Sequence, residues 1–170
     1  MSTNNIQDEF LLLVQTHQGL LHKICHLYEN HTTDREDLFQ EMILQLWKSY
    51  GSFRGEARIS TWIYRIALNT ALSSIRKSKR RVPVSYPENI PHEVSEEKKD
   101  NIREEQLRFL YKAVAGLTEI ERALVMLYLD EKSYDEMEEI MGISSGTLRV
   151  KMNRIKEKLK KQTKDFEYGT

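Results

Sequence analysis

FRGEARISTWIYRIALNTALSSIRKSKRR, residues 53–81, predicts a long helix that is basic on one face and apolar over much of the rest. It holds eight Lys or Arg and one acid, Glu56, a local net charge of +7 in a chain whose formal charge is zero. Steps of three and four residues place on one helical face Arg58, Trp62, Arg65, Asn69, Ser73, Arg76 and Arg80. Guanidinium groups neutralise phosphates, an indole stacks on a base, and an amide reads a base edge. The stretch therefore predicts a nucleic-acid-binding helix, with a solvated basic face as the alternative.

The preceding residues predict the helices against which this one packs. Apolar residues keep helical spacing from residue 6 to about residue 29, which predicts one long helix or two short ones, with Gly19 as an expected weak point or break. Thr33 and Glu36 form a capping-box pattern that predicts a second helix from about Asp34 to Gly51. Its expected buried stripe is Leu38, Met42, Ile43, Leu46, Trp47 and Tyr50.

The opposite face of this second predicted helix is acidic and rich in amides. It comprises Glu36, Asp37, Gln40, Glu41, Leu44 and Gln45, with Phe39 and Leu44 expected to be exposed. Such a face suits docking onto a basic helical partner, and an ordinary solvated surface is the alternative.

A change in composition separates two modules. All three prolines, Pro83, Pro87 and Pro91, fall in a polar, mostly acidic stretch without apolar periodicity. We expect an all-α fold of two small helical domains, residues 1–80 and 105–165, joined by a flexible linker over residues 81–104.

The second module has the pattern of a helix-turn-helix. Thr118 and Ser133 each begin a capping box, and Gly142 is placed to end a helix in a left-handed conformation. Ser144 can cap a last helix in which Leu148, Met152, Ile155 and Leu159 repeat at core spacing.

Charge distinguishes the two helices of this motif. Residues 134–141 hold four acids and no base, whereas residues 145–164 hold eight bases and one acid. The last helix is therefore the one predicted to approach DNA, through an outer face with Arg149, Val150, Asn153, Arg154 and Lys156. A solvated basic C-terminal helix is the alternative.

Several site classes lack support in the sequence. The single cysteine, Cys25, makes no internal disulfide, and His22, Cys25 and His26 lack the further ligands that a zinc site needs. There is no nucleophile–base arrangement, phosphate-cradling loop, signal peptide or membrane-length apolar run. We expect a cytoplasmic protein that is not an enzyme, with no metal, no cofactor and no membrane insertion.

Taken together, the chain resembles the bacterial RNA polymerase sigma factors of the small extracytoplasmic-function (ECF) type in the sigma-70 family. DREDLFQEMILQLW and SFRGEARISTWIYRIALNTA are similar to motifs of the family's region 2. The stretch LTEIERALVMLYLDEKSYDEMEEIMGISSGTLRVKMNRIKEKL is similar to region 4.

The resemblance implies partners and roles. It implies core RNA polymerase as a partner, through its beta-prime clamp and beta flap. The residues implied to lie on the helix that docks on the clamp are Asp37, Gln40, Glu41, Leu44 and Gln45. It implies capture of the melted minus-ten element by Phe53, Arg54, Gly55, Arg58, Trp62, Arg65, Asn69 and Arg76. Reading of the minus-thirty-five element is implied for Ser145, Thr147, Arg149, Val150, Asn153 and Arg154. Promoter DNA and an anti-sigma factor are the other expected partners of a protein that is monomeric when free.

Three positions depart from the family pattern. Met137 and Glu138 stand where Ile and Ala are common, and Ile155 stands where Ala is frequent. The rival hypotheses are a dimeric helix-turn-helix regulator, which would leave the N-terminal module without a role, and an adaptor that binds acidic proteins through its basic helices.

Overall fold

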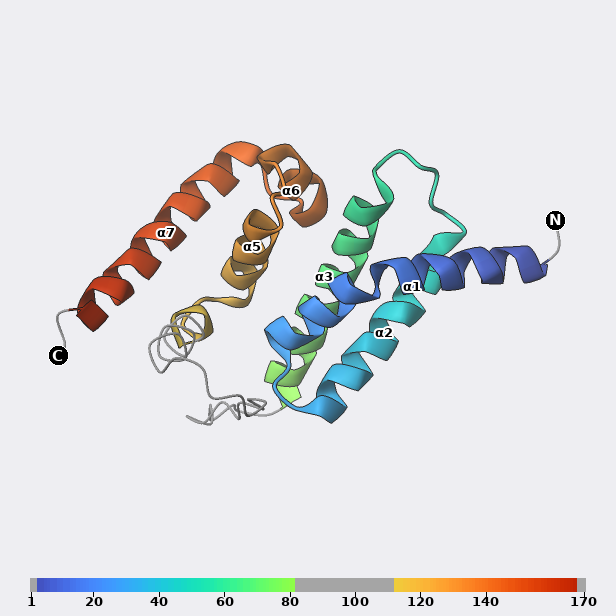
Figure 1. Cartoon of the computed structure of the whole chain (residues 1–170), viewed down its shortest axis with the longest axis horizontal. Helices are drawn as coiled ribbons and strands as arrows, with labels where there is room; N and C mark the ends of the chain where they lie inside the picture. The colour runs from blue at the N-terminus through green and yellow to red at the C-terminus, as the bar shows by residue number, and fades with distance from the viewer. Residues whose placement is uncertain (1–2, 82–111, 168–170) are drawn as a thin grey trace, which may run out of the picture. The chain divides into compact units, whose positions relative to one another are not determined.

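The computed structural model describes residues 3–81 and 112–167, which form helices joined by turns and loops and contain no strand (Figure 1). The chain divides into two compact units, Met1–Pro91 (unit 1) and His92–Thr170 (unit 2). The prediction of an all-α fold with two small helical domains is confirmed. The predicted linker lies outside the described residues except for Arg81, the last residue of its helix. Within the described ranges, no helix combines the length and the apolarity needed to cross a bilayer.

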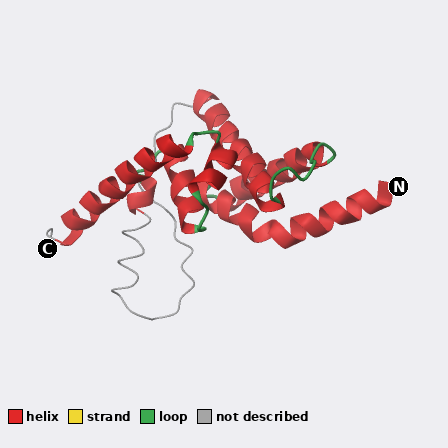
Figure 2. Cartoon of the chain, turned by 90° about the horizontal axis from the view of Figure 1, so that it is seen from above, coloured by secondary structure: helices red, strands yellow, loops and turns green. Residues whose placement is uncertain are grey.

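Unit 1 contains three helices that pack against one another: α1 (Thr3–Tyr28), α2 (Thr32–Tyr50) and α3 (Ile59–Arg81). Each helix contributes fully buried side chains to one core, which include Leu21, Ile24, Met42, Leu46, Ile63 and Leu68. Figures 1 and 2 show the N-terminal half of α1 extending beyond α2 and α3. The predicted burial of the apolar side of α3 is confirmed, and this burial turns its polar side outward.

Of the two alternatives for the first helical stretch, the single long helix is confirmed, because α1 passes through Gly19 without a break. Two other local predictions for unit 1 are wrong. The Thr33 capping box is absent, because α2 starts at Thr32 and its N-cap is His31, which makes no side-chain capping bond. The stretch 53–58 is a loop rather than the start of the helix, because Gly55 adopts a left-handed φ of 73° that a helix excludes.

Two predictions of side-chain exposure on α2 are also wrong. Trp47, predicted to be buried, is 41% exposed and meets the ring of Phe10 edge-on at 4.9 Å between centroids. Phe39, predicted to be exposed, is half-buried and stacks on His22 at 4.6 Å.

Unit 2 is built from a short helical turn at residues 112–115, α5 (Glu119–Leu129), α6 (Tyr134–Met141) and α7 (Ser145–Glu167). α7 packs against both α5 and α6. Their shared core contains the fully buried side chains Leu124, Leu127, Met137, Ile140, Leu148 and Met152. An ion pair between Lys158 and Glu121, 3.2 Å long, adds a polar link between α7 and α5. Ile120, predicted at a core position, is 37% exposed.

Candidate nucleic-acid and partner interfaces

The loop between α2 and α3 encloses a hollow of about 370 Å³ with the first turns of α3. Its lining residues are Ser52, Phe53, Arg54, Glu56, Ala57, Trp62 and Arg65. The N–H groups of Ser52 and Phe53 donate to the carbonyls of Ser49 and Tyr50 at 3.1 Å, which anchors the start of the loop to the end of α2. The start of the loop is thereby fixed to α2, and its residues line the hollow together with Trp62 and Arg65 of α3.

Two aromatic rings form one wall of this hollow. Phe53 and Trp62 are both half-buried, with ring centroids 5.0 Å apart and planes inclined by 45°. Arg54 and Arg65 are exposed at the same hollow. A fixed aromatic surface next to two guanidinium groups can accept an unstacked base and its phosphate.

The predicted minus-ten residues fall into three groups. Phe53, Arg54, Trp62 and Arg65 line the hollow, and Gly55 shapes the loop. Arg58 is exposed at the start of α3, where its carbonyl accepts the N–H of Trp62 at 3.1 Å. Asn69 and Arg76 are exposed farther along α3, and Asn69 lines a different groove.

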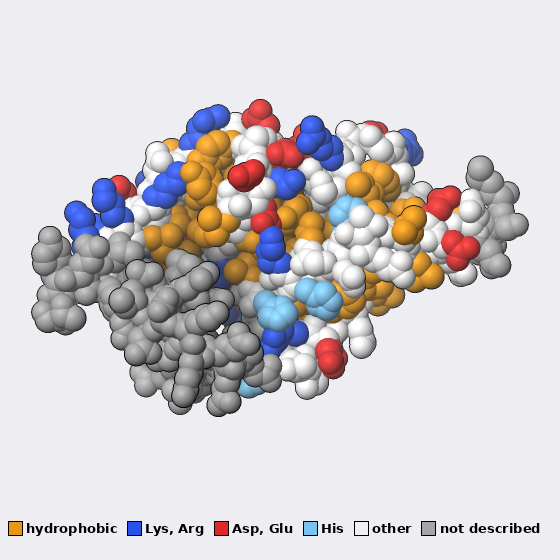
Figure 3. Space-filling view, in the orientation of Figure 1, with side chains coloured by type: hydrophobic (Ala, Val, Ile, Leu, Met, Phe, Trp, Pro, Cys, Tyr) orange, Lys and Arg blue, Asp and Glu red, His pale blue; other side chains and the backbone are white. Residues whose placement is uncertain are grey.

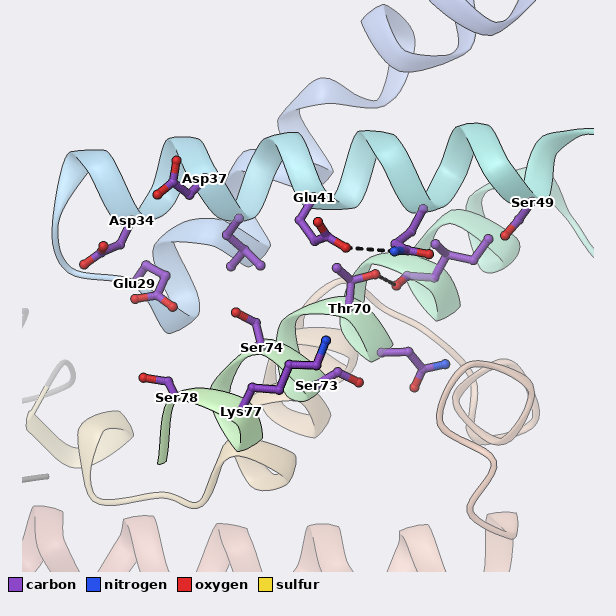
Figure 4. Close-up of a pocket in the computed structure, with 14 residues that line it drawn as sticks. Glu29, Asp34, Asp37, Glu41, Ser49, Thr70, Ser73, Ser74, Lys77 and Ser78 are labelled. Atoms are coloured by element: carbon purple, nitrogen blue, oxygen red, sulfur yellow. Dashed lines mark hydrogen bonds between the residues drawn. The ribbon is translucent and has the colours of Figure 1, made fainter. Parts of the chain in front are cut away.

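That second groove runs between α2 and α3 and has a volume of about 820 Å³ (Figure 4). Acids from the α1–α2 connection and α2 face hydroxyl groups and Lys77 of α3; the labelled lining residues are Glu29, Asp34, Asp37, Glu41, Ser49, Thr70, Ser73, Ser74, Lys77 and Ser78. Burial is the main cause that raises the pKa of Glu29, and the nearby Asp34 carboxylate raises it further. The acidic wall suits a partner that presents cations.

The predicted docking residues of α2 are accessible. Asp37, Gln40, Glu41 and Leu44 are exposed and Gln45 is half-buried. Asp37, Glu41 and Gln45 line the groove, and Gln45 donates to Glu41 at 2.7 Å.

Trp47 is a candidate that the sequence reasoning missed. It is exposed, and so is Leu44, which precedes it by three residues on α2 and is itself 45% exposed. The fully buried residues of α2 repeat at intervals of four, as Leu38, Met42 and Leu46. Trp47 lies about 100° around the helix from Leu46, outside the narrow face that these three residues define. The four-residue spacing of the buried residues could therefore have indicated that Trp47 is exposed.

In unit 2 the structure confirms the local signals for a helix-turn-helix. Thr118 and Ser133 both form complete capping boxes. Gly142 ends α6 at a left-handed φ of 67°, and the Ser144 hydroxyl accepts the N–H of Thr147 at 3.4 Å.

The outer face of α7 is basic and exposed. Leu148, Met152 and Ile155 are buried, which leaves outward Arg149, Val150, Asn153 and Arg154. Figure 3 shows Lys and Arg side chains along the part of the view where α7 lies. Ser145 and Thr147 lie in its first turn, where Ser145 is half-buried and Thr147 exposed.

The three departures from the family pattern have clear places in the structure. Met137 and Ile155 are buried in the core of unit 2. Glu138 is exposed, and its carboxylate accepts the N–H of Ser145 at 2.7 Å, so it caps the first turn of α7 from α6.

The alternative of a metal site at His22, Cys25 and His26 finds no support. Cys25 is buried and its pKa is raised to about 11, chiefly by burial, which disfavours the thiolate that a metal requires. His22 and His26 are exposed, and His26 Nδ1 donates to the carbonyl of His22 at 2.8 Å. Within residues 3–81 and 112–167, no three side chains of His, Cys, Asp or Glu lie close enough together to hold a metal ion.

Comparison with known proteins places the chain in a family. Residues 13–81 match the model described as Sigma-70 region 2, and residues 108–159 match Sigma-70, region 4. The ECF RNA polymerase sigma-E factor of Escherichia coli (strain K12) is 30% identical over 164 residues, covering 89% of this chain and 84% of that protein. The chain belongs to the ECF sigma factors of the sigma-70 family. Another ECF sigma factor, SigW of Bacillus subtilis (strain 168), is 28% identical over 173 residues, with coverage of 94% and 91%.

Two solved structures share the fold. The sigma factor RpoE in complex with the anti-sigma factor NepR from Bartonella quintana aligns with a TM-score of 0.71 at 20% identity, over 95% of this chain and 98% of that one. CnrH in complex with the cytosolic domain of CnrY aligns with a TM-score of 0.66 at 19% identity, over 93% and 89%. As an ECF sigma factor, the protein is a transcription initiation factor that directs RNA polymerase to promoters.

Proposed function

We propose that this ECF sigma factor docks on core RNA polymerase through α2 and divides promoter recognition between its two units. Unit 1 captures the melted minus-ten element and unit 2 reads the minus-thirty-five element. The observation that carries the proposal is the hollow at residues 52–65, where an aromatic wall and two exposed arginines meet.

At the minus-ten element, one base leaves the duplex and enters the hollow. Stacking on Trp62 or Phe53 offsets the cost of unstacking, which is a few kcal/mol. Arg54 and Arg65 neutralise the adjoining phosphates, and Asn69 and Arg76 contact the strand as it continues along α3.

At the minus-thirty-five element, α7 enters the major groove. Arg149 and Asn153 offer the side-chain chemistry that distinguishes guanine and adenine, and Val150 can contact a thymine methyl group. Arg154 and the lysines farther along α7 suit phosphate contacts.

Docking on the polymerase rests on the acidic and apolar face of α2. Asp37, Gln40, Glu41, Leu44 and Gln45, with Trp47 added, are proposed to contact the beta-prime clamp, and unit 2 the beta flap. The anti-sigma factor NepR bound to the similar sigma factor RpoE supports the further proposal that an anti-sigma factor covers these surfaces. Free of such partners, the protein acts as a monomer in the cytoplasm and performs no bond chemistry.

Run-off transcription tests the proposal. Purified core enzyme is supplied with a pool of genomic promoter fragments, with and without the protein, and the transcripts are sequenced. We expect new start sites that share sequence blocks near minus ten and minus thirty-five. Initiation no greater than with core enzyme alone would contradict the proposal.

The rival reading as an ordinary helix-turn-helix regulator makes a different prediction. A dimeric regulator binds paired half-sites of duplex DNA without polymerase. We expect the free ECF sigma factor to sediment as a monomer and to bind duplex promoter DNA weakly until core enzyme is added.

A further inference from the structure

The ring of Tyr134 lies beneath the side chain of Arg149 at the start of the proposed recognition helix. The guanidinium carbon of Arg149 is 4.6 Å from the centroid of the Tyr134 ring. Arg149 is exposed and Tyr134 is half-buried at the first position of α6. We propose that Tyr134 is a positioning residue, which holds the Arg149 guanidinium in place and thereby sets the base preference at one position of the minus-thirty-five element. This inference rests on the proposed function of unit 2.

A second contact fixes the register of the two helices around this pair. Tyr134 and Glu138 are one turn apart on α6, and Ser145 and Arg149 are one turn apart on α7. Glu138 accepts the N–H of Ser145 at 2.7 Å, and Arg149 lies over Tyr134. Two contacts, one helical turn apart, therefore join α6 to α7. Met137, on the same helix, is fully buried in the core of unit 2, which holds α6 in place beneath the start of α7.

The physical effect is preorganisation of a flexible side chain. An unsupported arginine samples many rotamers, and ordering it on binding reduces affinity. A guanidinium that lies on an aromatic ring keeps its N–H groups at its edge, where they can donate to the two acceptors of a guanine. Cation–π contacts at exposed sites correspond to about a two- to fivefold change in an equilibrium constant, enough to alter a base preference measurably.

A similar pair farther along α7 supplies an internal control. Lys156 Nζ lies 4.2 Å from the ring centroid of Tyr128 and donates to its hydroxyl at 3.0 Å. Lys156 follows Arg149 by seven residues, about two turns of the helix. A lysine is a point charge that suits phosphate and lacks the planar fork of donors with which arginine reads a guanine. Tyr128 should therefore influence affinity without influencing base preference.

The test uses the full chain assembled with core enzyme on templates whose minus-thirty-five positions are randomised. Transcripts are sequenced to give the base preference at each position for the wild type, Tyr134→Leu, Tyr134→Phe, Arg149→Ala and the double variant Tyr134→Leu/Arg149→Ala. We expect Arg149→Ala to remove the preference at one position. Tyr134→Leu should reduce the preference at that same position by about two- to fivefold. Tyr134→Phe keeps the aromatic ring and should retain the wild-type preference. The double variant should show the same preferences as Arg149→Ala.

The control variant is Tyr128→Leu, which should lower initiation on all templates alike. Three results would overturn the inference: an unchanged preference in Tyr134→Leu, a uniform loss at every position as from misfolding, or a further loss in the double variant beyond Arg149→Ala. Failure of the proposed function gives a different result, because the wild type would then initiate no better than core enzyme alone.

Discussion

Trp62 has the surroundings expected of a stacking platform. Phe53 lies against it at 5.0 Å and Tyr50 at 6.4 Å between ring centroids, so neighbouring rings limit its motion. It is half-buried and lines the hollow together with Arg54 and Arg65. A ring held in this way loses little freedom when a base stacks on it.

Trp62→Ala should therefore impair promoter melting. Base–aromatic stacking contributes about 1–3 kcal/mol per base, so the open complex should become about 5- to 150-fold less stable. Permanganate reactivity of minus-ten thymines, at saturating core enzyme, measures this effect. Trp62→Phe keeps an aromatic plane and should retain most of the melting; equal melting by wild type and Trp62→Ala would count against the stacking role.

Cys25 gives a prediction of pH dependence. Burial raises the pKa of its thiol from the ordinary 9.0 to about 11, so the folded protein keeps its proton while the unfolded chain loses it. Between pH 9 and 11 the unfolded state therefore binds fewer protons, and the free energy of unfolding should fall. Denaturant unfolding at pH 8 and pH 10.5 should show a larger loss for the wild type than for Cys25→Ala; equal losses would show that the thiol does not contribute.

At the residue scale, the sequence predicted exposure best where polarity and helical position agree. Arg65, Asn69, Arg149 and Asn153 are polar and lie opposite the core, and all are exposed as expected. The prediction for Trp47 failed because this aromatic residue, which follows the buried Leu46 directly, was assigned to the core, whereas its side chain is 41% exposed. How Glu138 and Tyr134 contact α7 was not predicted, because these contacts depend on how two helices are packed.

At the scale of elements, some sequence patterns for helix starts predicted the observed caps correctly and one did not. Capping boxes at Thr118 and Ser133 were predicted correctly, because in each case the predicted residue stands directly before the first residue of the helix. The Thr33 pattern failed because α2 already begins at Thr32, before the predicted cap. There the helix begins early, with the Arg35 N–H bonded to the His31 carbonyl and the Arg35 guanidinium bonded to the Asn30 carbonyl.

The turn between α6 and α7 can be tested with two glycines. Gly142→Ala places a side chain at a φ of 67° and should destabilise unit 2 by about 1–2 kcal/mol. Gly146, in the first turn of α7, has open space where a Cβ would be added, so Gly146→Ala should be neutral or stabilising by up to about 1 kcal/mol. Hydrogen exchange of α6 and α7 amides measures both, and similar protection in the two variants would contradict the left-handed cap.

The docking face of α2 makes a prediction for assembly. Leu44→Asp places a charge at the centre of the proposed contact and should weaken binding to core enzyme by at least about tenfold, since apolar contacts at the centre of an interface commonly exceed 1 kcal/mol. Leu12→Asp is the matched control, because Leu12 is 64% exposed and belongs to α1, which contributes none of the proposed docking residues. Fluorescence anisotropy of labelled protein titrated with core enzyme measures both, and equal affinities would remove α2 from the interface.

At the scale of the whole molecule, each unit was predictable because its helices bury their apolar faces against one another. Leu21, Met42 and Leu68 form one core, whereas Leu124 and Leu148 belong to another. Residues 81–104 have no comparable apolar periodicity, so the sequence separates the units without specifying their arrangement. We infer that core polymerase presents the two units to promoter elements at a fixed spacing.

The division of work between the units is the central claim, and footprinting one promoter with two variants tests it most directly. Core enzyme with Arg149→Ala should show reduced protection over the minus-thirty-five element, whereas core enzyme with Trp62→Ala should keep that protection and show reduced permanganate reactivity of thymines at minus ten. If either variant removed both signals together, or if neither variant changed its own signal, the assignment of the two elements to the two units would be wrong.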